Sequence, residues 1–102
     1  MVLILKGSGT IVTDGRRVYR NSTGNPGMAT GGSGDVLTGV VAALIGQGLT
    51  AFDATVLGTW VHGRAGDAAA AVLGQTALTA ADLIEYLPAA FREVEFRVSS
   101  FE

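Results

Sequence analysis

The decisive stretch of the chain reads Thr30-Gly31-Gly32-Ser33-Gly34-Asp35-Val36-Leu37. Its glycines lead into apolar doublets four residues apart, from Val36-Leu37 to Leu44-Ile45, and this spacing predicts an amphipathic helix over residues 35–47. Backbone N–H groups left open by glycine therefore converge at a helix N-terminus, where the helix dipole adds partial positive charge. The stretch predicts an anion site; the simpler alternative is a tight turn in which Ser33 or Asp35 only caps the helix.

The glycine pattern excludes two common nucleotide-binding motifs. No Gly-Lys-[Ser/Thr] follows the glycines, as a P-loop requires, and Leu37 stands where the dinucleotide fingerprint needs its third glycine. Asp35 adjoins the anion site, so once a substrate excludes water its carboxylate could accept a proton from a hydroxyl beside a bound phosphate. Asp35 is therefore the candidate base.

The residues before this stretch predict a functional loop after a small sheet. Residues 21–34 show neither the period of a helix nor that of a strand. Long loops without secondary structure in compact domains usually carry function. Asn21, Thr23 and Asn25 are expected to hold the loop through side-chain turns, although Asn25 could also line a nucleotide site. Asp14-Gly15 between two β-rich runs predicts a hairpin over residues 10–20.

The N-terminal run Val2-Leu3-Ile4-Leu5 is entirely apolar. It predicts a strand over residues 2–6 that is buried on both faces, as in the interior of a parallel sheet. Lys6 at its end could reach a phosphate, because ligands bind at strand ends in open α/β sheets, or could simply extend into solvent.

The rest of the chain predicts two further helices. They start at capping-box-like sequences after Thr50 and Thr79 and cover residues 51–73 and 80–92. Pro88 should kink the last helix or lie near a break, and residues 94–98 could form a short strand or extend that helix.

Other polar and aromatic side chains of these helices favour structural roles. His62, the single histidine, is more often packed and hydrogen-bonded than catalytic, and Trp60 is expected to pack between helices. Asp53 and Asp67 are interpreted as solvated or capping carboxylates.

Length and composition limit the function further. The 102 residues are expected to form one domain, residues 1–102, and 48% hydrophobic residues provide for a core. A net charge of −2 without a basic run argues against nucleic acid, and the lack of cysteine excludes disulfides and thiolate metal sites. The N-terminal apolar run is too short for a signal peptide or a membrane span. We expect a soluble, cytoplasmic protein with no structural metal.

The predicted elements are too few to surround the predicted buried strand over residues 2–6. One apolar strand, one hairpin and three helices leave part of that strand without neighbours, so either copies of the chain associate or the chain is the C-terminal piece of a larger α/β domain. An uncovered apolar strand edge favours association, and a homo-oligomer is expected.

Four segments together are similar to a known family: Leu5–Thr10, Thr13–Gly15, Asn25–Gly39 and His62–Asp67. Their sequences, above all Asn-Pro-Gly-Met-Ala-Thr-Gly-Gly-Ser-Gly-Asp-Val-Leu-Thr-Gly, resemble the ADP/ATP-dependent NAD(P)H-hydrate dehydratases of the ribokinase-like superfamily. The resemblance implies an α/β fold, namely the C-terminal portion of a ribokinase-like three-layer αβα fold with a buried strand, a β-hairpin, a Gly-rich loop and three helices.

The resemblance also implies a reaction and a site. Hydrated NADH or NADPH would lose its hydroxyl as water, driven by ADP or ATP with Mg²⁺, in a metabolite-repair reaction. Asp35 would be the catalytic base and would bind the hydrated substrate together with Asn25. The adenine nucleotide would be bound by Lys6, Gly7, Ser8, Gly9, Thr10, Gly31, Gly32, Ser33 and Gly34.

Two alternatives stand beside this interpretation. A small-molecule kinase of the same superfamily would use Gly34 and Asp35 to deprotonate an acceptor hydroxyl. A truncated chain would instead be inactive, would bind adenine nucleotide weakly and would associate with itself.

Overall fold

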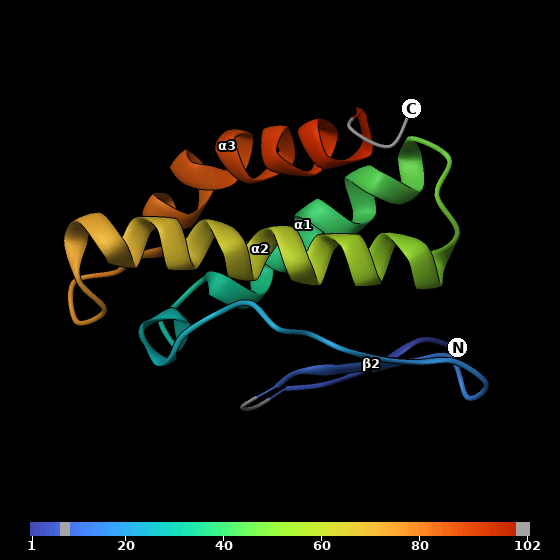
Figure 1. Cartoon of the computed structure of the whole chain (residues 1–102). Helices are drawn as coiled ribbons and strands as arrows, with labels where there is room; N and C mark the ends of the chain where they lie inside the picture. Colours follow the sequence, from blue (N-terminus) through green and yellow to red (C-terminus); the bar gives the residue numbers. More distant parts are fainter. Residues whose placement is uncertain (7–8, 100–102) are drawn as a thin grey trace.

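The structure is a computed structural model that describes residues 1–6 and 9–99. Its elements are the strands β1 (Leu3–Leu5), β2 (Ile11–Thr13) and β3 (Val18–Arg20), the short 3-10 helix η1 (Pro26–Met28), and the helices α1 (Ser33–Gly46), α2 (Ala51–Leu73) and α3 (Ala80–Ser99). Figure 1 shows the sheet on one side of the helices, α1 and α2 next to it, and α3 on the far side. The chain has the α/β fold expected from its sequence, with α2 contacting α1, α3, β2 and η1.

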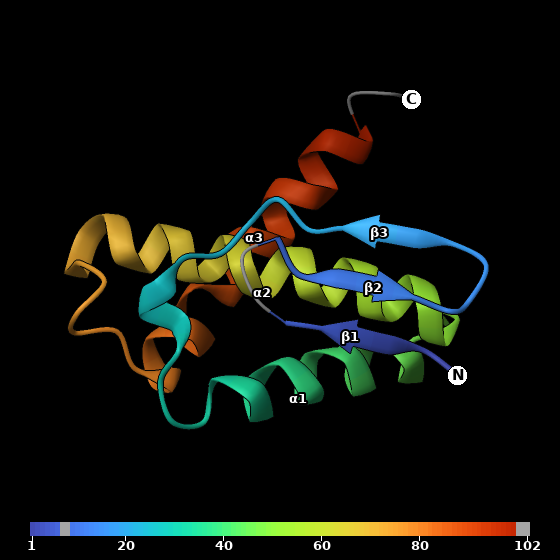
Figure 2. The same ribbon diagram turned by 90° about the horizontal axis from the view of Figure 1, so that it is seen from below.

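The three strands form one antiparallel sheet in the order β1-β2-β3. Ile4, Val12 and Tyr19 are in register on the face towards the helices, and Val12 is fully buried. Figure 2 shows the strands side by side in front of α1 and α2. The sheet therefore covers the helices with one face only.

The predicted burial of the first strand is wrong. β1 is an edge strand with an antiparallel neighbour, and Leu3 and Leu5 are 51% and 58% exposed. Only the alternate side chain, Ile4, faces the helices, because side chains of a strand point to opposite faces in turn. An apolar run predicts a strand but not how many neighbours the strand has.

The hairpin is confirmed and has a local cause. Asp14 Oδ1 accepts hydrogen bonds from the backbone N–H groups of Arg16 at 2.9 Å and Arg17 at 2.7 Å, while Gly15 adopts φ +91°. These bonds, the one from Arg17 above all, lower the pKa of Asp14 to about 2. The turn thus depends on an ionised Asp14.

All three predicted helices are present, and the bounds of α1 and α3 differ from those predicted. The expected range of α2 is confirmed, since Thr50 caps it by accepting a hydrogen bond from the Asp53 N–H at 3.2 Å. α1 begins two residues earlier than predicted, because Gly32 at φ +86° serves as the N-cap. α3 runs unbroken through Pro88 to Ser99, so residues 94–98 extend the helix and do not form a strand.

The core lies between the helices and beneath the sheet. Leu83, Val12 and Val61 are its largest fully buried side chains. One cluster joins α1 to α2 through Val40, Leu44 and Ala54, and a second joins α2 to α3 through Val61, Ala65 and Ala90. Trp60 packs against the second cluster, as predicted.

In the described part of the chain, no helix is long and apolar enough to cross a membrane.

Candidate functional site

A large cavity lies where the sheet, the loop before α1 and the N-terminus of α1 meet. It has a volume of about 990 Å³. One side is formed by residues 21–30, here called the wall segment, of which all but Gly27 line the cavity. The cavity brings together six of the predicted site residues: Lys6, Gly9, Thr10, Asn25, Ser33 and Gly34.

The N-terminus of α1 presents open backbone amides to this cavity. Gly32, the N-cap, has no side chain with which to cap the helix, and the Ser33 N–H donates to the Thr30 carbonyl at 3.2 Å. The next amides, those of Gly34 and Asp35, belong to the first turn, where a helix offers its N–H groups no acceptor. This is the arrangement predicted for an anion site.

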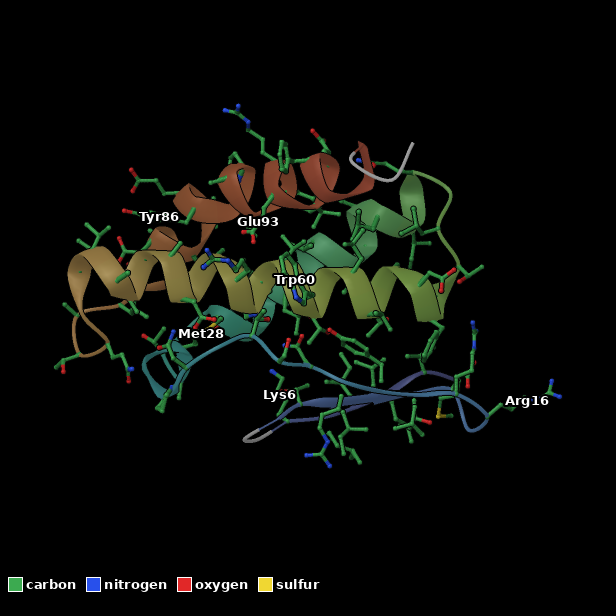
Figure 3. All side chains as sticks on the ribbon, in the orientation of Figure 1. Lys6, Arg16, Met28, Trp60, Tyr86 and Glu93 are labelled. Atoms are coloured by element: carbon green, nitrogen blue, oxygen red, sulfur yellow. The ribbon has the colours of Figure 1, made fainter. Side chains whose placement is uncertain are left out.

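Lys6 adds a positive charge to the same place. Its side chain points from the end of β1 towards the helices (Figure 3). A Cβ atom built on Gly34 would lie 3.3 Å from Lys6 Nζ, so ammonium and helix terminus adjoin each other. Lys6 therefore points to the predicted phosphate position.

His62 is packed and hydrogen-bonded, as predicted, and it also lines the cavity. Its Nε2 lies 3.0 Å from the Ser33 carbonyl oxygen and 3.3 Å from Ser33 Oγ. Burial lowers the pKa of His62, the hydrogen bond to Ser33 opposes this, and the Lys6 charge lowers the pKa further. A neutral ring that carries its proton on Nε2 donates to the Ser33 carbonyl and fixes the first residue of α1.

Asp35 lies beside the cavity and does not line it. Its carboxylate is exposed on the first turn of α1, in a second groove of about 530 Å³ between α1 and α3 that also contains Leu87 and Phe91. Gly31 and Gly32 are exposed and do not line the cavity either. Gly7 and Ser8 lie outside the described residues.

Side chains of the wall segment make the predicted bonds within it, and they also attach it to α2, which was not predicted. Asn25 caps η1 by accepting from the Gly27 N–H at 3.0 Å, and Asn21 donates to the Thr23 carbonyl at 3.1 Å. The interpretation of Asp67 as a solvated or capping carboxylate misses its main contacts, because Asp67 accepts hydrogen bonds from Gly24 and Asn25. Gly63 and Gly66, three residues apart on one helix face, signal a close neighbour but not its identity.

The described residues offer no cluster of three or more His, Cys, Asp or Glu side chains that could hold a metal ion. The titratable side chains that line the cavity are Lys6 and His62.

Comparison with protein families matches residues 1–89 to the model described as NAD(P)H-hydrate dehydratase. The chain belongs to this dehydratase family. The resemblance to this family is thereby confirmed, and the Asn25–Gly39 block lies within the matched residues.

Individual relatives support the same family assignment. The bifunctional NAD(P)H-hydrate repair enzyme Nnr of Moorella thermoacetica is 54% identical over 101 residues, which cover 97% of this chain and 19% of that protein. The same enzyme of Thermofilum pendens is 53% identical over 91 residues, covering 88% and 17%. The ADP-dependent (S)-NAD(P)H-hydrate dehydratase of Neisseria meningitidis is 44% identical over 91 residues, covering 86% and 29%. The chain thus spans about a fifth of the length of the first two relatives.

Proposed function

We propose that the chain carries the adenine-nucleotide phosphate site of an ADP-dependent or ATP-dependent NAD(P)H-hydrate dehydratase. The observation that supports this most directly is the position of Lys6 Nζ, 3.3 Å from where a Gly34 Cβ would lie, at the open N-terminus of α1. An ammonium and unpaired first-turn amides together favour a multiply charged phosphate. Gly9 and Thr10 line the same cavity, on the side of the sheet.

For the reaction, we propose nucleotide-driven loss of a hydroxyl from hydrated NADH or NADPH. Asp35 would take up the proton of that hydroxyl. It follows Gly34 directly in the first turn of α1, and its exposed side chain lines the neighbouring groove between α1 and α3. Gly7, Ser8, Gly31, Gly32 and Ser33 would contribute to nucleotide binding and Asn25 to substrate binding. Adenine nucleotides and reduced nicotinamide dinucleotides are metabolites of the cytoplasm, where we place the reaction.

The described residues do not form a Mg²⁺ site of their own. Protein Mg²⁺ sites use one or two carboxylates with phosphate oxygens and water, and no described residue that lines the cavity carries a carboxylate. In this proposal Mg²⁺ belongs to the nucleotide phosphates, and no step depends on a protein-held ion.

The proposal is tested by calorimetric titration of the chain with ADP, ATP and AMP in the presence of Mg²⁺. ADP or ATP should bind more tightly than AMP, because additional phosphate charge reaches Lys6 and the α1 amides. Gly34→Val should weaken that binding by about tenfold or more, since its side chain fills the space before Lys6 Nζ.

Gly39→Val is the matched control, because it makes the same change on the same helix at a position where a Cβ has no atom within 4 Å. It should leave nucleotide affinity unchanged. A folded chain that binds none of the three nucleotides would refute the proposal, and so would equal weakening by both substitutions.

A further inference from the structure

The wall segment needs an external support to form one side of a site. Its only helical element is η1, three residues long, and an irregular segment of this length pays a conformational entropy cost when fixed. Its own hydrogen bonds are short-range: Met28 N–H to the Asn25 carbonyl at 3.1 Å and Ala29 N–H to the Pro26 carbonyl at 3.2 Å. One bond ties its start to the residue before β2, where the Asn21 N–H donates to the Thr10 carbonyl at 2.7 Å. The other long-range bonds go to α2, and among them Thr23 Oγ1 donates to the Trp60 carbonyl at 2.9 Å.

The α2 surface is shaped to receive this segment. A Cβ on Gly63 would overlap Thr23 and the Gly24 backbone nitrogen, and one on Gly66 would overlap the Met28 side chain. Figure 3 shows Met28 on the side of η1 that faces α2. Gly63 and Gly66 therefore form a shallow groove, and the segment lies in it at backbone contact.

One charged side chain borders this groove. Asp67 Oδ2 accepts a hydrogen bond from the Gly24 N–H at 3.0 Å, and Asp67 Oδ1 accepts one from Asn25 Nδ2 at 2.9 Å. Asn25 Oδ1 in turn accepts from the Gly27 N–H at 3.0 Å. A carboxylate suits this position because both facing groups are donors, whereas an amide can satisfy only one of them.

Asp67 does not line the cavity, so it acts on the site through the segment it holds. We propose that Asp67 is a positioning residue: its carboxylate, through Gly24 and Asn25, fixes the wall segment on α2 and so sets the affinity of the cavity for nucleotide. The inference rests on the proposed function where it concerns affinity, whereas the position of the wall segment is measured independently.

The first test is amide hydrogen exchange measured by NMR on the chain and on Asp67→Asn. The Gly24 and Gly27 amides should exchange about tenfold or more faster in the variant. Gly24 and Asn25 lose their charged acceptor, and Asn25 is then no longer fixed as the acceptor of the Gly27 N–H. Amides of the α2 interior such as Val61 should change less than twofold, which separates local release from global destabilisation. Unchanged exchange at Gly24 and Gly27 would overturn the proposal.

Asp53→Asn is the matched control, since it makes the same change on the same helix at an exposed carboxylate. It should leave exchange at Gly24 and Gly27 as it is in the chain itself. Equal acceleration by Asp53→Asn would show a general effect of charge on α2 and would also overturn the proposal.

A reciprocal exchange of the two partners provides a rescue. Asn25→Asp alone places two carboxylates against each other and should accelerate exchange as Asp67→Asn does. In the double variant the amide at position 67 can accept from Gly24 and donate to the carboxylate at position 25, whose other oxygen still accepts from Gly27. Exchange should return to within about twofold of the unmodified chain. A double variant no better than the single ones would refute the hydrogen-bond chain.

Titration with ADP and Mg²⁺ then separates this inference from the proposed function. The chain should bind ADP, and Asp67→Asn should bind it about tenfold more weakly. Equal affinity despite faster exchange would overturn the positioning role. If the unmodified chain binds no ADP, the proposed function fails, and the exchange data alone decide whether Asp67 fixes the wall segment.

Discussion

Two glycines at the start of α1 contribute in different ways. Gly32 is needed for its backbone, since its φ of +86° lies in the left-handed region that disfavours side chains. Gly34 is needed for its missing side chain, because a Cβ there would approach Lys6 Nζ to 3.3 Å. Left-handed backbone conformation and open space are thus supplied by separate glycines at the start of α1.

At the residue scale, Asp35→Asn tests the base. Turnover of hydrated NADH should fall by about 100-fold or more, because the amide keeps the shape but cannot accept the proton. Nucleotide affinity, measured by calorimetry, should stay within about twofold, because the backbone amides and Lys6 are unchanged. Asp53→Asn, at another exposed first-turn carboxylate, is the control. Retained turnover in Asp35→Asn would rule out its role as the base.

His62 predicts a pH dependence of stability. Its pKa is lowered in the folded chain, chiefly by burial, so the unfolded chain binds the proton first as pH falls. The free energy of unfolding should therefore decrease as pH is lowered from neutral, below the ordinary histidine value of 6.5 and down through the folded pKa. Urea unfolding at several pH values measures this slope, and His62→Gln, which removes the single histidine, should flatten it. An equal slope in the variant would show that other groups cause it.

At the element scale, local chemistry explains which parts of the fold could be predicted. The hairpin follows from Asp14 and Gly15, which make the turn by themselves, and α2 follows from its Thr50 cap. The neighbours of β1 and the length of α3 do not follow, because both depend on tertiary packing. Pro88 normally ends a helix, but here the stripe of Leu83, Leu87 and Phe91 continues across it.

The candidate site, too, contains residues that the sequence predicts and contacts that it does not. Gly34 is predicted because a glycine-rich helix start has a recognisable sequence. The strand end alone leaves Lys6 between a phosphate contact and solvent, and only the family resemblance favours the phosphate. The contact of His62 with Ser33 spans 29 residues, and that of Asp67 with Gly24 spans 43. No local pattern specifies such pairs, so the partners of these two residues appear only in the folded structure.

Alanine substitution at two helix glycines should change the free energy of unfolding in opposite directions. Gly66→Ala should lower the free energy of unfolding by about 1–3 kcal/mol, because the new methyl overlaps Met28 on η1. Gly39→Ala should raise it by about 0.5–1 kcal/mol, because its Cβ has no atom within 4 Å and alanine favours helix. Denaturant unfolding measures both. If the two variants shift stability in the same direction, α2 does not hold η1 as closely as described.

At the scale of the whole molecule, the sheet face turned away from the helices is open and carries exposed apolar side chains. Leu3, Leu5 and Val18 lie on it, and Val18 is 72% exposed. β1 and β3 are both edge strands, and exposed apolar edges promote association. This face supports the proposal that the chain is a homo-oligomer.

Light scattering at micromolar concentration tests this association. The unmodified chain should show a mass above 10.4 kDa, and Leu5→Lys should shift the mass towards that of the monomer, because a lysine on the open face repels its copy. Thr38→Lys, on the exposed side of α1, is the control and should not change the mass. A monodisperse monomer for the unmodified chain would contradict the proposal.

The attachment of the wall segment to α2 also orders the events of folding. Consecutive helices meet across short connections, whereas Asp67 meets Gly24 and Asn25 across 43 and 42 residues of chain. Contacts between residues distant in sequence pay a larger loop-closure cost and form late. The helices can therefore assemble before the cavity has its second side. A folding chain therefore cannot bind its ligand until the wall segment has docked on α2. Loss of Asp67 should mainly accelerate the release of this segment and leave the rate at which the helices assemble almost unchanged.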